Sequence, residues 1–290
     1  MDENLEFTNY KITKEYENVY YFLKENGFSE NFITNLRKKE GYILINNNIA
    51  NTKSKLKLKD VLSICNSPNQ KTTIMHCIIP LDIVYEDKYY LLVNKPSNLS
   101  TMPNRSHYTN NLAGAICNYM EKENKNFVLR IINRLDKDTS GLILIAKNAI
   151  AQKDIKSFEK TYFAICEGVI KKQQTINLPI LTLSNNNINE RKRIISKDGK
   201  PATTIVTPLK HFKNYTLISA KLIQGRTHQI RLHLSSIGHP LLGDTLYGKS
   251  SPFITHTALV CKEISFFHPY KKKALTFSVP LPEDIKSLLN

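Results

Sequence analysis

The chain has 290 residues, enough to bury a sizeable core in one large domain or in two unequal ones. Its 41% hydrophobic and 23% charged residues are typical of a globular protein, and its longest apolar runs, such as residues 141–146, are too short to span a bilayer. Its 41 Lys and Arg exceed its 25 Asp and Glu by 16, and this net charge modestly favours a nucleic acid partner over a merely solvated surface.

The N-terminus and the cysteines both point to a reducing compartment. Residues 1–6, Met-Asp-Glu-Asn-Leu-Glu, lack the basic start and apolar stretch of a signal peptide. The five cysteines are scattered, without a C-x-x-C pair, which argues against a disulfide framework and against a zinc site. We therefore expect a cytoplasmic protein whose cysteines act as small buried hydrophobic residues.

Residues 1–79 are predicted to form a small α+β domain. Two segments have helical spacing of apolar residues and two have the composition of strands: residues 16–24, 29–39, 42–46 and 61–65. Ser29 is the expected N-cap of the second helix. A polar, proline-containing stretch at residues 67–71 is typical of a link between domains.

Residues 80–290 are predicted to form one α+β domain on a large mixed, mainly antiparallel sheet. Short apolar or alternating runs predict strands at residues 83–85, 89–93, 142–146, 162–168 and 215–223. Two helical stretches, residues 112–122 and 149–156, lie between them. No repeat of fixed period is visible.

Asp136 is the candidate catalytic residue. It follows apolar residues and precedes the turn signal Thr139-Ser140-Gly141 and an apolar strand. A carboxylate in this place can be a ligand, a nucleophile, a general base or a turn-forming residue, and the last role is the commonest for an arbitrary Asp.

The sequence around Asp136 matches an extended pattern. Residues 133–142 resemble H-R-L-D-x-x-T-S-G-L, the signature of the RluA-type RNA pseudouridine synthases. Further blocks follow the order of that family: N-K-P at 94–96, K-x-Y-x-A at 160–164, G-K-P-A-x-T at 199–204, G-R-T-H-Q-I-R-x-H at 225–233, G-H-P-x-x-G-D-x-x-Y-G at 238–248 and H-P at 268–269. The resemblance covers about residues 81–283 and implies the pseudouridine synthase fold and the isomerisation of uridine in RNA.

The resemblance assigns three catalytic residues. Asp136 is the carboxylate that assists departure of the base, either by covalent attack or by taking a proton, and the sequence does not choose between the two routes. Tyr162 offers an aromatic face for the uracil and a hydroxyl that could move the C5 proton. Arg231 pairs with Asp136 and keeps it ionised.

Other residues are implied to contact RNA. Arg134 is expected to fill the space that the flipped-out uridine leaves, by stacking its guanidinium among bases. Arg226 and His228 are expected to be structural or RNA-contacting. No metal-site spacing and no phosphate-binding glycine loop occur in the sequence, so we expect neither a metal nor another cofactor.

The N-terminal domain loosely resembles the S4-type RNA-binding module, in which a basic second helix lies against RNA. Arg37, Lys38 and Lys39 are the corresponding residues, and a solvated helix end is the alternative. Such a module usually accompanies enzymes acting on ribosomal RNA. We therefore expect a monomer that acts on large-subunit (23S) ribosomal RNA and binds no membrane, with transfer RNA as the alternative substrate.

Three positions depart from the family pattern. Asn133 replaces a histidine and keeps hydrogen-bonding capacity, Asn98 replaces a glycine and tolerates positive φ, and Val260 replaces a histidine with an unknown effect. Two other functions compete with the enzyme: a non-catalytic RNA-binding or ribosome-assembly protein, and a nucleoside hydrolase. The hydrolase commonly needs a second carboxylate, and Asp138, the nearest, is outside the matched blocks.

Overall fold

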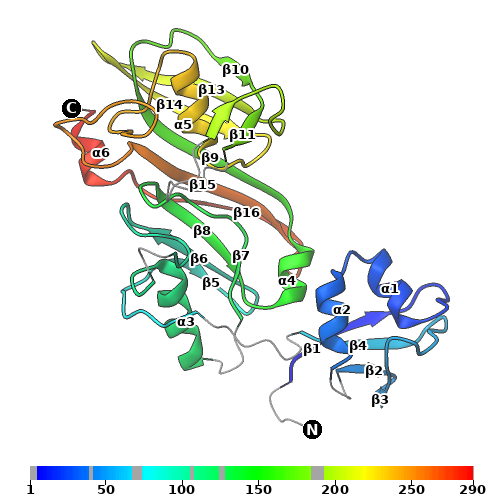
Figure 1. Ribbon diagram of the computed structural model, residues 1–290. Coiled ribbons are helices and arrows are strands. Elements are labelled where there is room, and N and C mark those ends of the chain that lie inside the picture. The colour runs from blue at the N-terminus through cyan, green and yellow to red at the C-terminus, as the bar shows by residue number, and fades with distance from the viewer. Residues whose placement is uncertain are drawn as a thin grey trace.

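The computed structural model describes residues 5–38, 42–66, 74–104, 108–123, 128–183 and 193–289. Within these ranges the chain forms two parts, each with its own sheet (Figure 1). In the same ranges, no helix is both long and apolar enough to cross a membrane. The predicted link at residues 67–71 lies outside the described residues.

The N-terminal part contains two short helices and a small sheet. Its elements are β1 (Phe7–Lys11), α1 (Val19–Glu25), α2 (Glu30–Leu36), β2 (Ile43–Ile45), β3 (Asn48–Ile49) and β4 (Val61–Cys65). The strand order is β1-β4-β2-β3, with antiparallel pairs. Ser29 caps α2 as predicted, because its side chain accepts a hydrogen bond from the Phe32 amide. The first helix begins at Val19 and not at Tyr16, since Tyr16 forms a bridge with Leu56.

The core of the N-terminal part extends into the second part of the chain. Apolar side chains of α1, α2, β2 and β4 pack together with Ile150, which is fully buried and belongs to α4 (Ala149–Asp154). Figure 1 shows α2 facing α4. Lys153 of α4 lies with its Nζ 4.5 Å from the ring centre of Phe28, and the Ala149 amide donates to the Asn66 carbonyl. The two parts therefore meet through α4.

The second part is built on a large twisted sheet. Its strands are β5 (Asp82–Glu86), β6 (Tyr90–Lys95), β7 (Arg130–Ile131), β8 (Ser140–Ala146), β9 (Lys156–Glu167), β10 (Gln174–Asn177), β13 (Thr203–His211), β14 (Tyr215–Leu222), β15 (Leu259–His268) and β16 (Lys273–Ser278). The strand order is β10-β13-β14-β9-β15-β8-β6-β5, with β16 paired to β15 and β7 paired to β8. Strands β8 and β15 are parallel, and the other pairs among the described residues are antiparallel, which confirms the predicted mixed, mainly antiparallel α+β class.

Strand β15 is where the sheet divides. Its first residues, Val260 and Cys261, pair with β8, while residues from Glu263 onward pair with β16 (Figure 1). Strand β9 pairs with β15 along most of its length. The long strands β9 and β15 therefore join the β10-β13-β14 half of the sheet to the β8-β6-β5 half.

The helices and a small hairpin cover this sheet. They are α3 (Leu112–Glu123), α4, α5 (Gln229–Ser236), α6 (Glu283–Ser287) and the pair β11 (Ile180–Thr182) and β12 (Arg193–Ile195). The β8 segment is buried at every position, as its unbroken apolar sequence predicts. All five cysteines are free and buried, which confirms their predicted role as small hydrophobic residues.

Candidate active site

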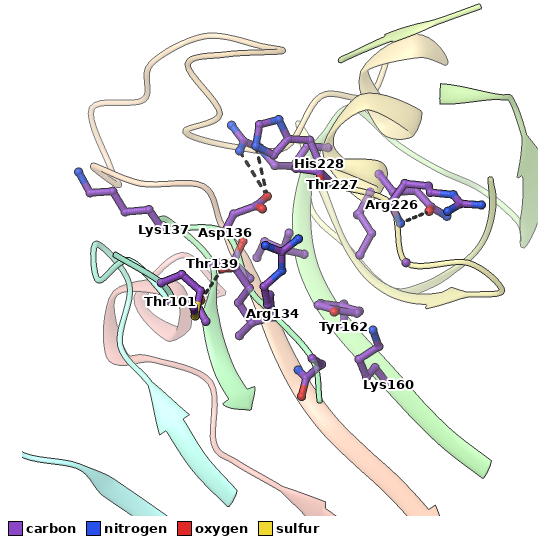
Figure 2. A pocket seen from close by; sticks show the side chains of 18 of the residues that line it. Thr101, Arg134, Asp136, Lys137, Thr139, Lys160, Tyr162, Arg226, Thr227 and His228 are labelled. Carbon is purple, nitrogen blue, oxygen red and sulfur yellow. Dashed lines mark hydrogen bonds and ion pairs between the residues drawn. The ribbon is translucent and has the colours of Figure 1, made fainter. Parts of the chain in front are cut away.

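A cavity of about 770 Å³ opens where β9, the turn after β7 and the segment before α5 meet. It is lined by residues 100–104 and 131–137, by Lys160 and Tyr162 of β9, and by residues 225–231. Figure 2 shows Asp136, Arg134, Tyr162 and Lys160 around this shared space. The sequence blocks that lie far apart along the chain thus come together in one place.

The Asp136 turn is held on both sides by hydrogen bonds. Thr101 Oγ1 donates to the Leu135 carbonyl at 2.6 Å, and Lys95 Nζ donates to the Lys137 carbonyl at 3.0 Å. The Asp136 carbonyl accepts from the Thr139 amide, so Asp136 does begin the turn that its sequence indicates. The side chain of Asp136 is 25% exposed. A rigid backbone therefore presents a partly accessible carboxylate to the cavity.

Lys95 is fully buried beneath this turn. Its Nζ also donates to the Pro96 and Leu99 carbonyls, both at 2.8 Å, so three carbonyls surround it. Burial lowers the pKa of Lys95 to about 7, although the nearby carboxylates of Asp136 and Asp138 oppose that shift. The N-K-P block thus fastens the end of β6 to the Asp136 turn.

Arg231 lies between two carboxylates. Its Nε and Nη2 donate to the two oxygens of Asp244 at 2.8 and 2.7 Å, and its Nη1 lies 3.6 Å from Asp136 Oδ2. Arg231 and Asp244 are both buried. Burial alone would lower the pKa of Arg231, but its hydrogen bonds to Asp244 outweigh burial and raise it. The same bonds outweigh the burial of Asp244 and hold the pKa of that carboxyl below its usual value.

His228 is the second basic neighbour of the Asp136 carboxylate. Its Nε2 lies 3.7 Å from Asp136 Oδ2, and its Nδ1 contacts the Tyr247 hydroxyl at 3.1 Å. Burial lowers the pKa of His228 despite the opposing effect of Asp136. The imidazole is therefore neutral at pH 7, and Arg231 is the charged partner of Asp136 at that pH.

Tyr162 forms the floor of the cavity on β9. Its side chain is 5% exposed, and Tyr162 is the cross-strand partner of Cys261 on β15. Burial raises the pKa of Tyr162 well above its ordinary value, and Cys261 adds to the rise. The phenol therefore stays protonated at neutral pH, and its ring is what faces the cavity (Figure 2).

Among the residues expected to contact RNA, Arg134 and Arg226 both line the cavity. Arg134 is exposed, and Arg226 donates from Nε to the Pro201 carbonyl at 3.2 Å. In the N-terminal part, Arg37 donates from Nε to Thr52 Oγ1 at 3.0 Å and lies over the ring of Tyr20.

Lys38 is exposed at the end of α2 and is the more available cation of the predicted basic helix end. Lys39 lies outside the described residues.

The departures from the family pattern have structural explanations. Buried Asn133 donates to the Leu142 carbonyl and accepts from the Leu144 amide, so it fastens the Asp136 segment to β8. Asn98 adopts φ of 60°, the positive value that its amide side chain tolerates, as predicted. Val260 is buried in a small apolar cluster.

Sequence reasoning assigned no role to Lys95 or Asp244, although both belong to matched blocks. A lysine before a proline and an aspartate after a glycine have no sequence spacing that reveals which residues they contact. Their function depends on contacts across 42 residues, from Lys95 to Lys137, and across 13 residues, from Arg231 to Asp244. Sequence reasoning also left His228 as a structural or RNA-contacting residue, whereas its ring lies beside Asp136.

Comparisons with known proteins agree with these features. Residues 89–236 match the model of the RNA pseudouridylate synthase family. An uncharacterised RNA pseudouridine synthase of Bacillus subtilis is 33% identical over 274 residues, which cover 91% of this chain and 95% of that protein. The ribosomal large subunit pseudouridine synthase D of Nitrosomonas europaea is 34% identical over 226 residues, 73% of this chain and 65% of that protein.

The solved structure of human RNA pseudouridylate synthase domain containing 4 covers 71% of this chain and 91% of its own, with a TM-score of 0.58 and 21% identity. This likeness confirms the predicted fold. Together with the ordered sequence blocks and the relatives, it establishes that the chain belongs to the RNA pseudouridylate synthase family.

Proposed function

We propose that this protein converts specific uridines of large-subunit ribosomal RNA to pseudouridine, with Asp136 as the catalytic carboxylate. The observation that carries the proposal is the placement of Asp136. Among the described residues that line the cavity it is the single acid, and it lies within 4 Å of both Arg231 and His228. An isolated carboxylate fits isomerisation better than hydrolysis of a glycosidic bond, which commonly uses two carboxylates.

The residues around Asp136 support a separate role for each in the proposed reaction. Arg231, fixed by Asp244, places a positive charge 3.6 Å from the carboxylate and orients it in the cavity for attack or for proton abstraction. Tyr162 supports the uracil with its ring, because the phenol is buried and its raised pKa keeps it protonated. Exposed Arg134 stands at the cavity edge, where it can occupy the place of the flipped nucleotide.

The choice of ribosomal RNA rests on the relatives and on the N-terminal part. Several relatives of about 34–36% identity are named ribosomal large subunit pseudouridine synthase D. We propose that residues 1–79 form an S4-like RNA-binding domain, residues 80–290 the catalytic domain, and that the protein acts as a cytoplasmic monomer. Exposed Lys38 supports RNA contact by α2, whereas Arg37 is engaged with Thr52 and Tyr20.

The test is pseudouridine mapping by carbodiimide-stop sequencing in cells that lack the protein. We expect one or more sites of large-subunit ribosomal RNA to disappear and to return with the wild-type gene but not with Asp136→Asn. Loss of sites in transfer RNA alone would make transfer RNA the substrate. Return of the sites with Asp136→Asn would instead support a non-catalytic role, and release of free uracil from an RNA oligomer would support a hydrolase.

The purified Asp136→Asn variant separates chemistry from binding. We expect it to form no detectable pseudouridine while its affinity for RNA stays within about threefold of wild type, since the substitution preserves shape and removes the reactive carboxylate. Filter binding and single-turnover assays measure the two properties. A loss of affinity equal to the loss of activity would show that Asp136 serves binding.

A further inference from the structure

Lys160 is a second cation in the cavity with no role in the steps described above. It lies on β9 two residues before Tyr162, and residues two apart on a strand share a face. Figure 2 shows the two side chains next to each other along β9. Lys160 is half-buried and lines the cavity beside Tyr162, the side chain proposed to support the uracil.

The ammonium of Lys160 has no counter-charge. Within the described ranges it makes no hydrogen bond or ion pair, and the ring centre of Phe158 lies 5.7 Å from its Nζ. Burial lowers the pKa of Lys160, and Cys261 offsets this shift only in part. Burial also raises the pKa of the Cys261 thiol to about 12, so that thiol is neutral at pH 7. A cation partly removed from water without an anion is unfavourable unless a ligand supplies one.

Lys95 is a buried lysine of this protein whose hydrogen-bond donors are used, because its Nζ donates to three carbonyls. Lys160 has no such arrangement, and Asp136, the acid of the cavity, is already next to Arg231 and His228. The other charged residues that line the described cavity are cations: Arg134, Lys137, Arg193 and Arg226. The surplus of positive charge fits an anionic ligand, and phosphates are the anionic groups of RNA.

The Lys160 ammonium borders the cavity and a stretch of backbone without a side chain. Lys160 lines the cavity of about 770 Å³, and a Cβ placed on Gly225 would lie in van der Waals contact with Lys160 Nζ, at 3.5 Å. Lysine binds phosphate as a point charge with three donors, and it needs no planar partner such as a carboxylate. A phosphate therefore has both the charge and the room to reach Nζ.

We propose that Lys160 binds a phosphate of the RNA backbone next to the target uridine and so holds the ribose in place while the detached uracil turns against Tyr162. This inference rests on the proposed function. The reaction breaks the bond between uracil N1 and the ribose and forms one from C5, so the base must rotate. A contact with a uracil carbonyl would have to break during that rotation, whereas a contact with the phosphate persists throughout.

The test compares Lys160→Gln with wild type on an RNA fragment that contains the mapped uridine. We expect KM and the RNA dissociation constant to rise about tenfold, with most of the loss in binding and not in kcat. The slope of log affinity against log salt should fall by about 0.7, the value for one lost contact with single-stranded phosphate. Lys160→Arg should recover most of the affinity, because it keeps the charge.

Lys273→Gln is the matched control, since Lys273 is exposed on β16 away from the cavity and its loss should leave KM and the salt slope unchanged. A methylphosphonate at the phosphate next to the target should weaken wild type as much as Lys160→Gln does. It should add no further loss in that variant. If Lys160→Gln does not fold, Lys160→Arg takes its place: the methylphosphonate should weaken wild type and Lys160→Arg alike, and an unchanged affinity of wild type for the methylphosphonate RNA would overturn the phosphate contact.

Additive losses, or a fall in kcat at unchanged KM and salt slope, would overturn the phosphate contact and point to an action on the base. A wild-type enzyme that forms no pseudouridine in any RNA would overturn the proposed function itself. The two failures are therefore distinguishable, because the first is seen only with an active wild-type enzyme.

Discussion

Arg231 contacts two carboxylates with one guanidinium, so we expect its position to affect both the free energy of unfolding and the rate of the proposed reaction. The bidentate contact with Asp244 is buried, so removing one partner leaves a desolvated charge without compensation. We expect Asp244→Asn to lower the free energy of unfolding by about 3 kcal/mol and to reduce kcat more than tenfold, as Arg231 loses its fixed orientation toward Asp136. Urea denaturation and single-turnover assays measure these effects.

Asp198→Asn is the control for Asp244→Asn, because Asp198 is exposed on a turn and makes no ion pair among the described residues. It should change the free energy of unfolding by less than about 0.5 kcal/mol. A stable but inactive Asp244→Asn protein would show that Asp244 tunes catalysis without contributing to the fold.

Lys95 gives a prediction about pH. Its pKa is about 7 in the folded protein and near 10.4 in an unfolded chain, so between these values the unfolded state binds more protons. The contribution of Lys95 to the free energy of unfolding therefore increases as pH rises from 7, with a slope approaching 1.4 kcal/mol per pH unit at most, about the full linkage value. Below pH 7 the lysine is charged in both states and the slope vanishes.

Lys95→Met removes this titration together with three hydrogen bonds. The difference in free energy of unfolding between wild type and Lys95→Met should grow between pH 7 and pH 9. Comparing the two proteins cancels the titration of the buried cysteines and tyrosines, which both proteins share. Urea titrations at several pH values measure the difference, and a constant difference would mean that Lys95 remains charged in the folded state.

The junction of β8 and β15 depends on a glycine. Gly141 has φ of 108°, and a Cβ there would lie 2.3 Å from the Cys261 carbonyl oxygen of the paired strand. We expect Gly141→Ala to lower the free energy of unfolding by about 2 kcal/mol or more, because the strands must separate or the backbone must change conformation. Thermal and urea denaturation measure the loss.

Gly238→Ala is the matched control for this element. Gly238 has φ of 82°, but nothing lies within 4 Å of the position that a Cβ would take. Its substitution carries the strain of positive φ alone, which is about 1 kcal/mol. Equal losses in the two variants would show that the close approach of β15 contributes nothing beyond the backbone conformation.

Local elements were more predictable than the contacts between them. The unbroken apolar run before Ala146 predicts a buried strand, and Ser29 predicts the start of α2, because both signals lie in neighbouring residues. The parallel pairing of β8 with β15 joins residues about 120 apart, and no periodicity encodes such a pairing. The same reason explains why Asp136 was identified from its own segment while its link to Asp244 through Arg231 was not.

At the scale of the whole molecule, α4 couples the two parts of the chain. It follows β8, which is central to the large sheet, and inserts Ile150 into the core formed by α1, α2, β2 and β4. An RNA held by the N-terminal part would therefore be positioned relative to β8 and to the Asp136 turn that precedes it. A firm junction at α4 would transmit such positioning.

Ile150→Ala tests this coupling. The substitution deletes a fully buried side chain, so we expect the free energy of unfolding to fall by about 2–5 kcal/mol. Because the lost side chain joins two cores, calorimetry should show one transition in wild type and two in the variant. Ile143→Ala is the control: Ile143 is equally buried but lies in the large core alone, so its loss should lower one transition without dividing it. If Ile150→Ala also keeps a single transition, the two parts are joined by contacts other than α4, and positioning of RNA by the N-terminal part would have to pass through them.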